Sequence, residues 1–170
     1  MKILAVQSRM GIGDTVIFLP FIKALSKKFN SPISILVKEN SKANQYLHQT
    51  KYIDKILTLE RDNKTNNRHG GFFGIFKLAN DLKKYKFDKI FIFNSSLRFN
   101  LVAKISGIPQ IYQYPLFAKN KQHIIEAPKK FLKENLDLDI NEDPEIQIDN
   151  DSISKACLLY TSDAADETVS

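Results

Sequence analysis

Short apolar runs alternate with amphipathic stretches along the first 136 residues of the chain. The runs are nearly continuous, which is typical of strands buried on both faces of a parallel sheet. They predict strands at residues 2–7, 33–37, 53–59, 89–93 and 111–114. The intervening stretches predict helices at residues 14–29, 41–48, 72–85, 97–106 and 123–136. Because strands alternate with helices, the sequence predicts an α/β fold with a doubly wound parallel sheet.

Capping and helix-breaking residues predict where some of these helices begin or break. We expect Asp14 to open the first helix and Ser41 to cap the second. Pro128 is expected to interrupt the last helix. Beyond that helix, residues 138–149 are acidic, and the alternation at residues 145–148 predicts a short strand within this connector.

Three phenylalanines lie near the start of the third predicted helix. We expect Phe72, Phe73 and Phe76 to belong to the core. An alternative is that Phe72 and Phe73, which follow Gly70 and Gly71, form a mobile hydrophobic lip against lipid.

Length and charge indicate a single domain with an unevenly distributed charge. A chain of 170 residues, with 43% hydrophobic and 26% charged residues, is expected to be one folded, cytoplasmic domain without a spanning segment or disulfides. Residues 1–133 hold 24 Lys and Arg against 8 Asp and Glu, whereas residues 134–156 hold one Lys against eight acids. Since 21 of the 25 cations are Lys, the basic body favours diffuse attraction to anions over a tight phosphate clamp.

The last 14 residues differ in character from the rest. Residues 157–166 read Cys-Leu-Leu-Tyr-Thr-Ser-Asp-Ala-Ala-Asp, which resembles the in-frame translation of a sequencing-library adapter. We therefore expect residues 157–170 to be non-native and the natural protein to continue beyond residue 156. The predicted organisation is a domain at residues 1–135, an acidic connector at 136–156 and this read-through segment.

The turn after the first strand holds the residues suited to chemistry. A turn between a strand and a helix is the usual anion and ligand site of doubly wound folds. The segment Met10–Val16 fails the dinucleotide fingerprint, since Val16 stands where a third small residue belongs, and it lacks the Gly-Lys-Ser/Thr of a phosphate-binding loop. A carboxylate at Asp14 can cap the helix or accept a proton from a bound hydroxyl group, and both roles can coexist.

Several segments, in order and spacing, resemble one enzyme family. They are Lys2–Val6, Gly13-Asp14-Thr15-Val16 with Leu19-Pro20, Tyr52–Leu57, Leu82–Phe91, Asn94–Arg98 with Ala103 and Gly107-Ile108, and the region from His123. Together they resemble glycosyltransferase family nine, the ADP-heptose:lipopolysaccharide heptosyltransferases. The resemblance covers about residues 1–150, the N-terminal half of that family.

The resemblance implies an architecture and a reaction. Members have the GT-B arrangement of two Rossmann-like domains, the first for the acceptor and the second for the nucleotide-sugar. This chain would be the N-terminal half, and ADP-heptose would bind mainly the missing domain. Transfer would invert the anomeric configuration without a cofactor or an obligatory metal, and Asp14 would be the general base.

The resemblance also implies a partner, namely an acidic lipopolysaccharide inner-core acceptor on a lipid anchor. The basic body suits such an acceptor and an anionic membrane surface. The resemblance further implies a cytoplasmic enzyme that lies peripherally at the inner face of the inner membrane of a Gram-negative bacterium. Expected acceptor contacts, placed where strand ends would face a cleft, are Ser8, Gly11, Gly13, Lys64, Arg68, His69, Ser96 and Arg98. No metal ligands are expected, because His48 and His123 have no partner at suitable spacing.

Two alternatives remain open. A family member could transfer another nucleotide-activated sugar, because donor choice belongs to the missing half. The chain could instead be a basic α/β binding module without catalysis. Nucleic acid is the less favoured partner of such a module, because the lysines lie mainly on helices without interleaved aromatic residues.

Overall fold

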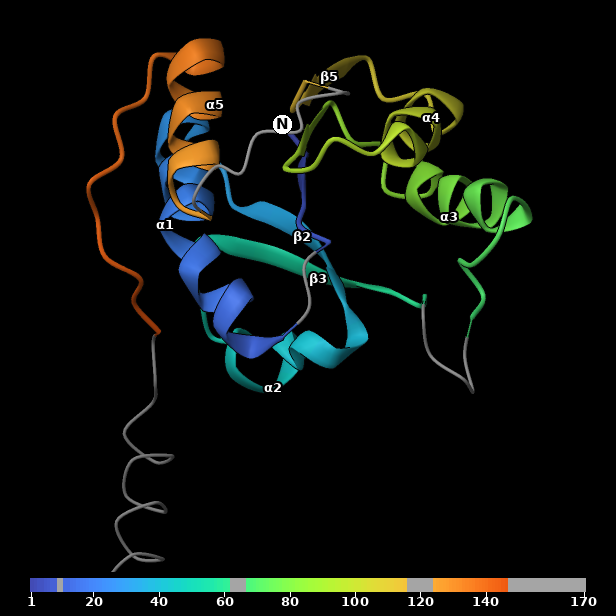
Figure 1. Cartoon of the computed structure of the whole chain (residues 1–170), viewed down its shortest axis with the longest axis horizontal. Helices are drawn as coiled ribbons and strands as arrows, with labels where there is room; N and C mark the ends of the chain where they lie inside the picture. The colour runs from blue at the N-terminus through green and yellow to red at the C-terminus, as the bar shows by residue number, and fades with distance from the viewer. Residues whose placement is uncertain (9–10, 62–66, 116–123, 147–170) are drawn as a thin grey trace, which may run out of the picture.

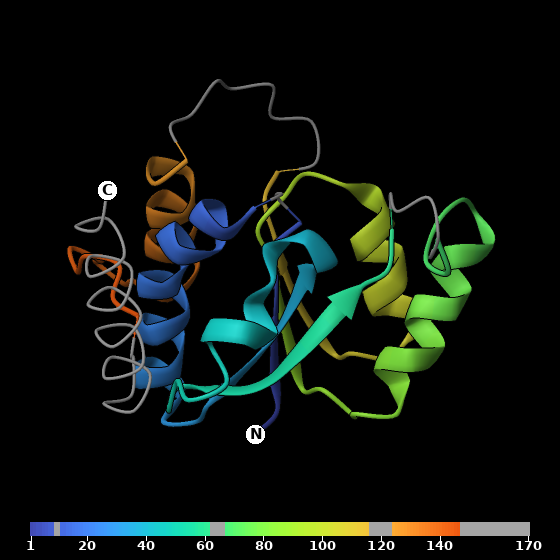
Figure 2. The ribbon, with the colours of Figure 1, turned by 90° about the horizontal axis from the view of Figure 1, so that it is seen from below.

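The computed structural model describes residues 1–8, 11–61, 67–115 and 124–146. Five parallel strands form one sheet in the order β3-β2-β1-β4-β5 (Figure 2). The strands are β1 Ile3–Val6, β2 Ile33–Lys38, β3 Ile53–Leu59, β4 Lys89–Ile92 and β5 Gln110–Gln113. The predicted Rossmann-like, doubly wound α/β fold is therefore confirmed, including the fifth strand.

Helices cover both faces of this sheet. They are α1 Ile12–Phe29, the 3₁₀ turn η1 Glu39–Ser41, α2 Ala43–Tyr46, α3 Phe73–Lys83, α4 Leu97–Ile105 and α5 Glu126–Leu136. Helices α1 and α5 lie on one face, and α3 and α4 lie on the other (Figure 1). Successive side chains of β1 alternate between the two cores, with Ile3 on the α1 side and Leu4 on the α3 side.

An aromatic cluster fixes α5 against the sheet. The rings of Phe18 and Phe93 lie 4.7 Å apart, and those of Phe93 and Phe131 lie 5.3 Å apart, both edge-to-face. Tyr114 adds a third such contact with Phe131 at 5.0 Å. This geometry is the favoured one for aromatic pairs, so residues from α1, from α5 and from the positions directly after β4 and β5 share one core.

Three local predictions were wrong. Helix α1 begins at Ile12 with Gly11 as its N-cap, so Asp14 lies inside the first turn and is not the cap. Lys42, at a φ of 49°, separates η1 from α2, so Ser41 ends a 3₁₀ turn and does not open a long helix. Pro128 does not interrupt α5, because it lies in the first turn, where a missing N–H has no partner to lose.

The predicted short strand in the connector is not formed at Glu145 and Ile146, and residues 147 and 148 lie outside the described ranges. The acidic segment, residues 137–146, instead packs against helices α1 and α5. Ile140 is 5% exposed in the core on the α1 side. Thus part of the connector belongs to the domain.

Ion pairs hold this acidic segment to the basic helices. Lys23 Nζ lies 3.2 Å from a carboxylate oxygen of Glu142 and 3.6 Å from one of Glu145, and Lys27 also pairs with Glu142. The hydrogen bonds from Lys27 and Lys23 lower the pKa of the Glu142 carboxyl. Burial, with the nearby charges of Glu145 and Glu142, raises the pKa of Tyr52 to about 12. Much of the connector's negative charge therefore offsets nearby lysines.

We expect Glu142→Gln to accelerate amide hydrogen exchange in residues 138–146, because it removes the shared partner of Lys23 and Lys27. Mass spectrometry of the exchanged segment measures the effect, and added salt should reduce the difference between wild type and variant. Glu134→Gln, which removes the 3.7 Å pair with Lys130, is the control. Unchanged exchange in Glu142→Gln would show that the apolar contacts of the segment and the pairs of Lys133 anchor it without Glu142.

Candidate functional site

The carboxyl ends of β1 and β4 meet the N-terminus of α1. The two strands are paired in register up to Val6 and Ile92, so the loops that follow them start side by side. Asn94, after β4, donates a hydrogen bond from Nδ2 to the Ser8 hydroxyl at 2.7 Å. The amide oxygen of Asn94 accepts the Ser96 N–H at 2.9 Å. Ser8 and Ser96 thus lie at one edge of the sheet, joined through Asn94.

Two amide side chains that were not predicted complete this network. Gln113 donates from Nε2 to the carbonyl oxygens of Asn94 (3.2 Å) and Ser96 (2.9 Å). Asn100 donates to Gln113 Oε1 at 2.8 Å. The position of Gln113 at the carboxyl end of a strand is the only sequence signal that could have suggested it. Its bonds fix the loop after β4.

Asp14 lies in the first turn of α1 beside this network. The carbonyl oxygen of Asp14 accepts a 3.4 Å bond from Gln7 Nε2, which ties the turn to the residue after β1. Gly11 has a φ of 107°, and a Cβ atom added there would lie 4.0 Å from Asp14 Oδ2. The carboxylate therefore points back toward Gly11, and the residue is half-buried. The helix dipole stabilises a negative charge at this position.

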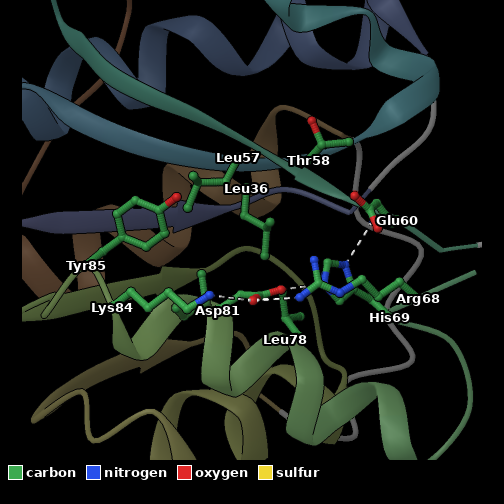
Figure 3. A pocket seen from close by; sticks show the side chains of 11 residues that line it. Leu36, Leu57, Thr58, Glu60, Arg68, His69, Leu78, Asp81, Lys84 and Tyr85 are labelled. Atoms are coloured by element: carbon green, nitrogen blue, oxygen red, sulfur yellow. Dashed lines mark hydrogen bonds and ion pairs between the residues drawn. The ribbon is translucent and has the colours of Figure 1, made fainter. Parts of the chain in front are cut away.

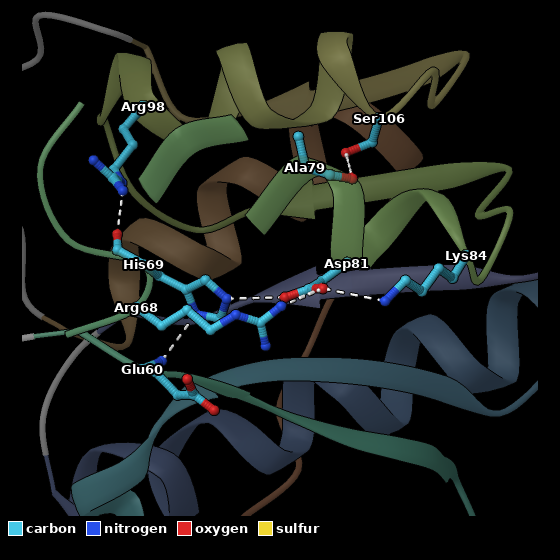
Figure 4. A network of polar contacts seen from close by, with 8 residues as sticks. All are labelled: Glu60, Arg68, His69, Ala79, Asp81, Lys84, Arg98 and Ser106. Carbon is cyan, nitrogen blue, oxygen red and sulfur yellow. Dashed lines mark hydrogen bonds and ion pairs between the residues drawn. The ribbon is translucent and has the colours of Figure 1, made fainter. Parts of the chain in front are cut away.

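A second polar cluster lies between the end of β3 and α3 (Figure 4). His69 is 3% exposed, and its Nδ1 accepts the Glu60 N–H at 3.1 Å. Its Nε2 lies 3.2 Å from Asp81 Oδ2, so the neutral ring donates there. Arg68 Nη2 lies 2.8 Å from Asp81 Oδ1, and Lys84 Nζ lies 3.4 Å from the same oxygen. Both nitrogens of His69 are therefore engaged within the fold.

These side chains border a pocket of about 230 Å³ (Figure 3). Its apolar lining comes from Leu36 and Leu57 on the sheet and from Leu78 on α3. Burial alone would raise the pKa of Asp81, but the His69 hydrogen bond and the charges of Arg68 and Lys84 together lower it. Asp81 is thus ionised and holds the loop before α3.

The lowered pKa of Asp81 predicts a stability that depends on pH. Because the folded-state pKa lies below the ordinary 3.8, the stabilisation is present above that value and is lost as the pH falls through the folded-state pKa. The free energy of unfolding of wild type should therefore exceed that of Asp81→Asn near neutral pH, and this difference should disappear in acid. Urea unfolding at a series of pH values measures it. In an Arg68→Gln background the stabilisation by Asp81 should be smaller, and its loss should be complete at a higher pH, because the folded-state pKa then lies closer to the ordinary value. A difference independent of pH would contradict the role of this carboxylate.

Arg98 joins the two helices of this face. It donates from Nη1 to the Gly71 carbonyl at 2.7 Å and from Nη2 to the His69 carbonyl. A Cβ atom added to Gly74 would lie 2.3 Å from the His69 carbonyl carbon and 2.9 Å from Arg98 Nη2. Arg98 and Gly74 therefore fix the loop before α3.

The structure divides the predicted acceptor contacts into two groups. Ser8, Gly11, Gly13 and Ser96 lie with Asp14 at the carboxyl ends of β1 and β4. The other described residues, Arg68, His69 and Arg98, lie around the end of β3 and the starts of α3 and α4. For buried His69 and for Arg98 the observed contacts favour a structural role over the predicted acceptor contact, since their polar groups bind the fold itself. Lys64 lies outside the described residues.

Two negative findings apply to the described part of the chain. No group of three or more His, Cys, Asp or Glu side chains lies close enough together to hold a metal ion. Within the same ranges, none of the helices has the length and apolar character needed to cross a bilayer.

Solved structures of glycosyltransferases share this fold. A glycosyl transferase family 9 protein from Veillonella parvula DSM 2008 matches 96% of this chain and 49% of its own, at a TM-score of 0.71 and 19% identity. Escherichia coli ADP-heptose LPS heptosyltransferase II matches 94% of this chain and 50% of its own, with a TM-score of 0.64 and 14% identity. E. coli heptosyltransferase WaaC with ADP-2-deoxy-2-fluoro heptose matches 84% of this chain and 50% of its own, at a TM-score of 0.56 and 12% identity. No protein-family model and no curated protein matches the chain.

Fold and site together define a Rossmann-like α/β unit with a carboxylate at the carboxyl edge of its sheet. The unit has the fold of about half of a glycosyltransferase of the GT-B type. The neighbours include family nine and ADP-heptose heptosyltransferases, which confirms, at the level of the fold, the family resemblance seen in the sequence. The chain spans about half the length of these structures.

Proposed function

We propose that this chain is the acceptor-binding half of an inverting glycosyltransferase of family nine, which adds heptose from ADP-heptose to the inner core of lipopolysaccharide. The observation that supports this most is the position of Asp14. It lies at the N-terminus of α1, beside the Ser8–Asn94–Ser96 network, in a chain with the fold of half a glycosyltransferase.

In the proposed reaction the Asp14 carboxylate accepts the proton of an acceptor sugar hydroxyl. That oxygen attacks the anomeric carbon of the donor, a new C–O bond forms with inversion, and the bond to the diphosphate breaks. ADP leaves with the electron pair. A carboxylate is a weak base toward a sugar hydroxyl, so proton transfer is expected late, when the attacking oxygen has already become acidic.

Charge supports an acidic acceptor. Residues 1–133 hold three times as many cations as acids, 24 against 8. The described part of the acidic segment pairs with Lys23 and Lys27 on α1 and with Lys133 on α5. We place the donor in the remaining half of the protein and the enzyme at the cytoplasmic face of a membrane that carries the acceptor.

Binding to the isolated chain tests the proposal. Inner-core oligosaccharide freed of its lipid should shift the NMR amide signals of Ser8, Gly11, Gly13 and Ser96, whereas ADP should leave them unchanged. Gly107, which lies at the opposite end of α4, is an internal control within the same spectra. Shifts caused by ADP alone, or by RNA and not by the oligosaccharide, would overturn the acceptor assignment.

A further inference from the structure

The predicted core position of Phe72, Phe73 and Phe76 was wrong. The three side chains are 68%, 77% and 48% exposed at the start of α3. Phe72 contacts Phe73 and Phe76 edge-to-face, with ring centroids 6.2 and 5.6 Å apart. The buried side of α3 is already complete without them, because it consists of Ile75, Leu78, Ala79 and Leu82. The phenylalanines therefore form an aromatic cluster in water.

Helix α4 adds a second set of exposed apolar side chains. Leu97, Leu101 and Ile105 are 51%, 45% and 44% exposed, and their spacing of four residues places them on one face. Helices α3 and α4 pack side by side over the same face of the sheet, joined by the bond from Ser106 Oγ to the Ala79 carbonyl (Figure 4). Since the buried residues of both helices point to the sheet, both exposed sets point outward. We call these six residues the outer apolar face.

The fold holds this face in place by specific contacts. Arg98 binds the carbonyls of His69 and Gly71, directly before Phe72. Gly71 has a φ of 59°, and Gly74 leaves no room for a Cβ atom against the His69 carbonyl. Phe72 and Phe73 thus follow a turn that is fixed from α4, and their exposure is a property of the folded domain.

The charge around the outer apolar face is positive. Residues 67–80 and 95–107 contain four cations, Arg68, Lys77, Arg98 and Lys104, and no Asp or Glu. Lys77 and Lys104 are exposed between the apolar positions. The acid that follows on α3, Asp81, is already paired with Arg68 and Lys84. This surface is therefore complementary to an anionic partner.

We propose that the outer apolar face docks onto an anionic lipid bilayer. Exposed Phe and Leu side chains beside lysines are typical of surfaces that lie in the membrane interface, where the rings enter the headgroup region and the ammonium groups meet lipid phosphates. Protein interfaces, by contrast, are depleted of Lys. The starts of α3 and α4 follow the carboxyl ends of β3 and β4, so docking would bring the Asp14 edge near the membrane. The docking itself does not depend on transfer chemistry.

A fluorescent probe tests this directly, because the chain contains no Trp. The Phe73→Trp chain, mixed with phosphatidylcholine vesicles that contain phosphatidylglycerol, should show a blue-shifted emission that brominated lipid quenches. Lys130→Trp, exposed on α5 at the opposite face, should show neither change. Equal responses of the two probes, or no response of Phe73→Trp, would overturn the proposal.

Charge reversal provides the second test. Lys77→Glu with Lys104→Glu should weaken vesicle binding by more than about tenfold. Lys51→Glu with Lys55→Glu, at the β3 edge of the sheet, changes the net charge equally and should have a smaller effect. Equal losses in the two double variants would overturn the assignment of the face. A concentration-dependent dimer that disappears in Phe72→Ser with Phe73→Ser, without vesicle binding by wild type, would assign the face to a second copy instead.

Discussion

Replacement of Asp14 by Asn is expected to lower kcat for sugar transfer by about 10²- to 10⁴-fold, the usual contribution of a positioned general base. The amide keeps the shape of the side chain but cannot accept the proton of the acceptor hydroxyl. The first turn of α1 should persist, because it is held by backbone groups and by bonds from Gln7 and Thr15 that do not use the carboxylate. The measurement is steady-state release of ADP by a full-length enzyme that contains this segment.

The matched control is Glu126→Gln, because Glu126 is the acid in the first turn of α5 and experiences a similar helix dipole. It should leave kcat unchanged. Donor binding by Asp14→Asn, measured by calorimetry with ADP, should equal that of wild type. Transfer at near wild-type rate by Asp14→Asn would refute the base assignment, whereas a parallel loss of ADP binding would indicate a structural defect.

Most of the fold could be predicted from the sequence, because strands buried in a parallel sheet are continuous apolar runs. Residues 33–37 and 89–93 could be assigned from hydrophobicity alone, and each assignment agrees with the structure within one residue. The start of α1 could not be assigned from the sequence, because Asp is common both at the N-cap and inside the first turn of a helix. Here Gly11, with its φ of 107°, is the cap, so Asp14 is the third residue of the helix, three positions beyond the cap.

The candidate site was predictable only in part, since its contacts join residues far apart in the chain. Ser8 and Asn94 are 86 residues apart and meet because β1 and β4 are paired. His69 was expected to contact the acceptor because it lies in the loop after the third strand, but its ring is buried and binds Asp81 on α3. The exposure of Phe73 follows from a different cause, namely that α3 has a complete apolar stripe without it. That stripe is visible in the sequence.

Gly74→Ala is expected to destabilise the domain by about 1–3 kcal/mol, the usual cost of overpacking. The added methyl group would lie 2.3 Å from both the carbon and the oxygen of the His69 carbonyl, so backbone must move. Moving that carbonyl also disturbs its bond with Arg98 and the ring of His69 against Asp81. Urea unfolding monitored by circular dichroism measures the change.

Gly13→Ala is a matched control, because Gly13 and Gly74 each occupy the second position of a helix. No atom lies within 4 Å of a Cβ added to Gly13, so the same substitution should be neutral or stabilise by up to about 1 kcal/mol. Of the two variants, only Gly74→Ala should thus lower the free energy of unfolding. Destabilisation of both by the same amount would point to a shared requirement for glycine in the first turn. Tolerance of Gly74→Ala would mean that the loop from His69 to Gly71 can move away from α3 at little cost, and the outer apolar face would then lack the fixed turn on which its exposure depends.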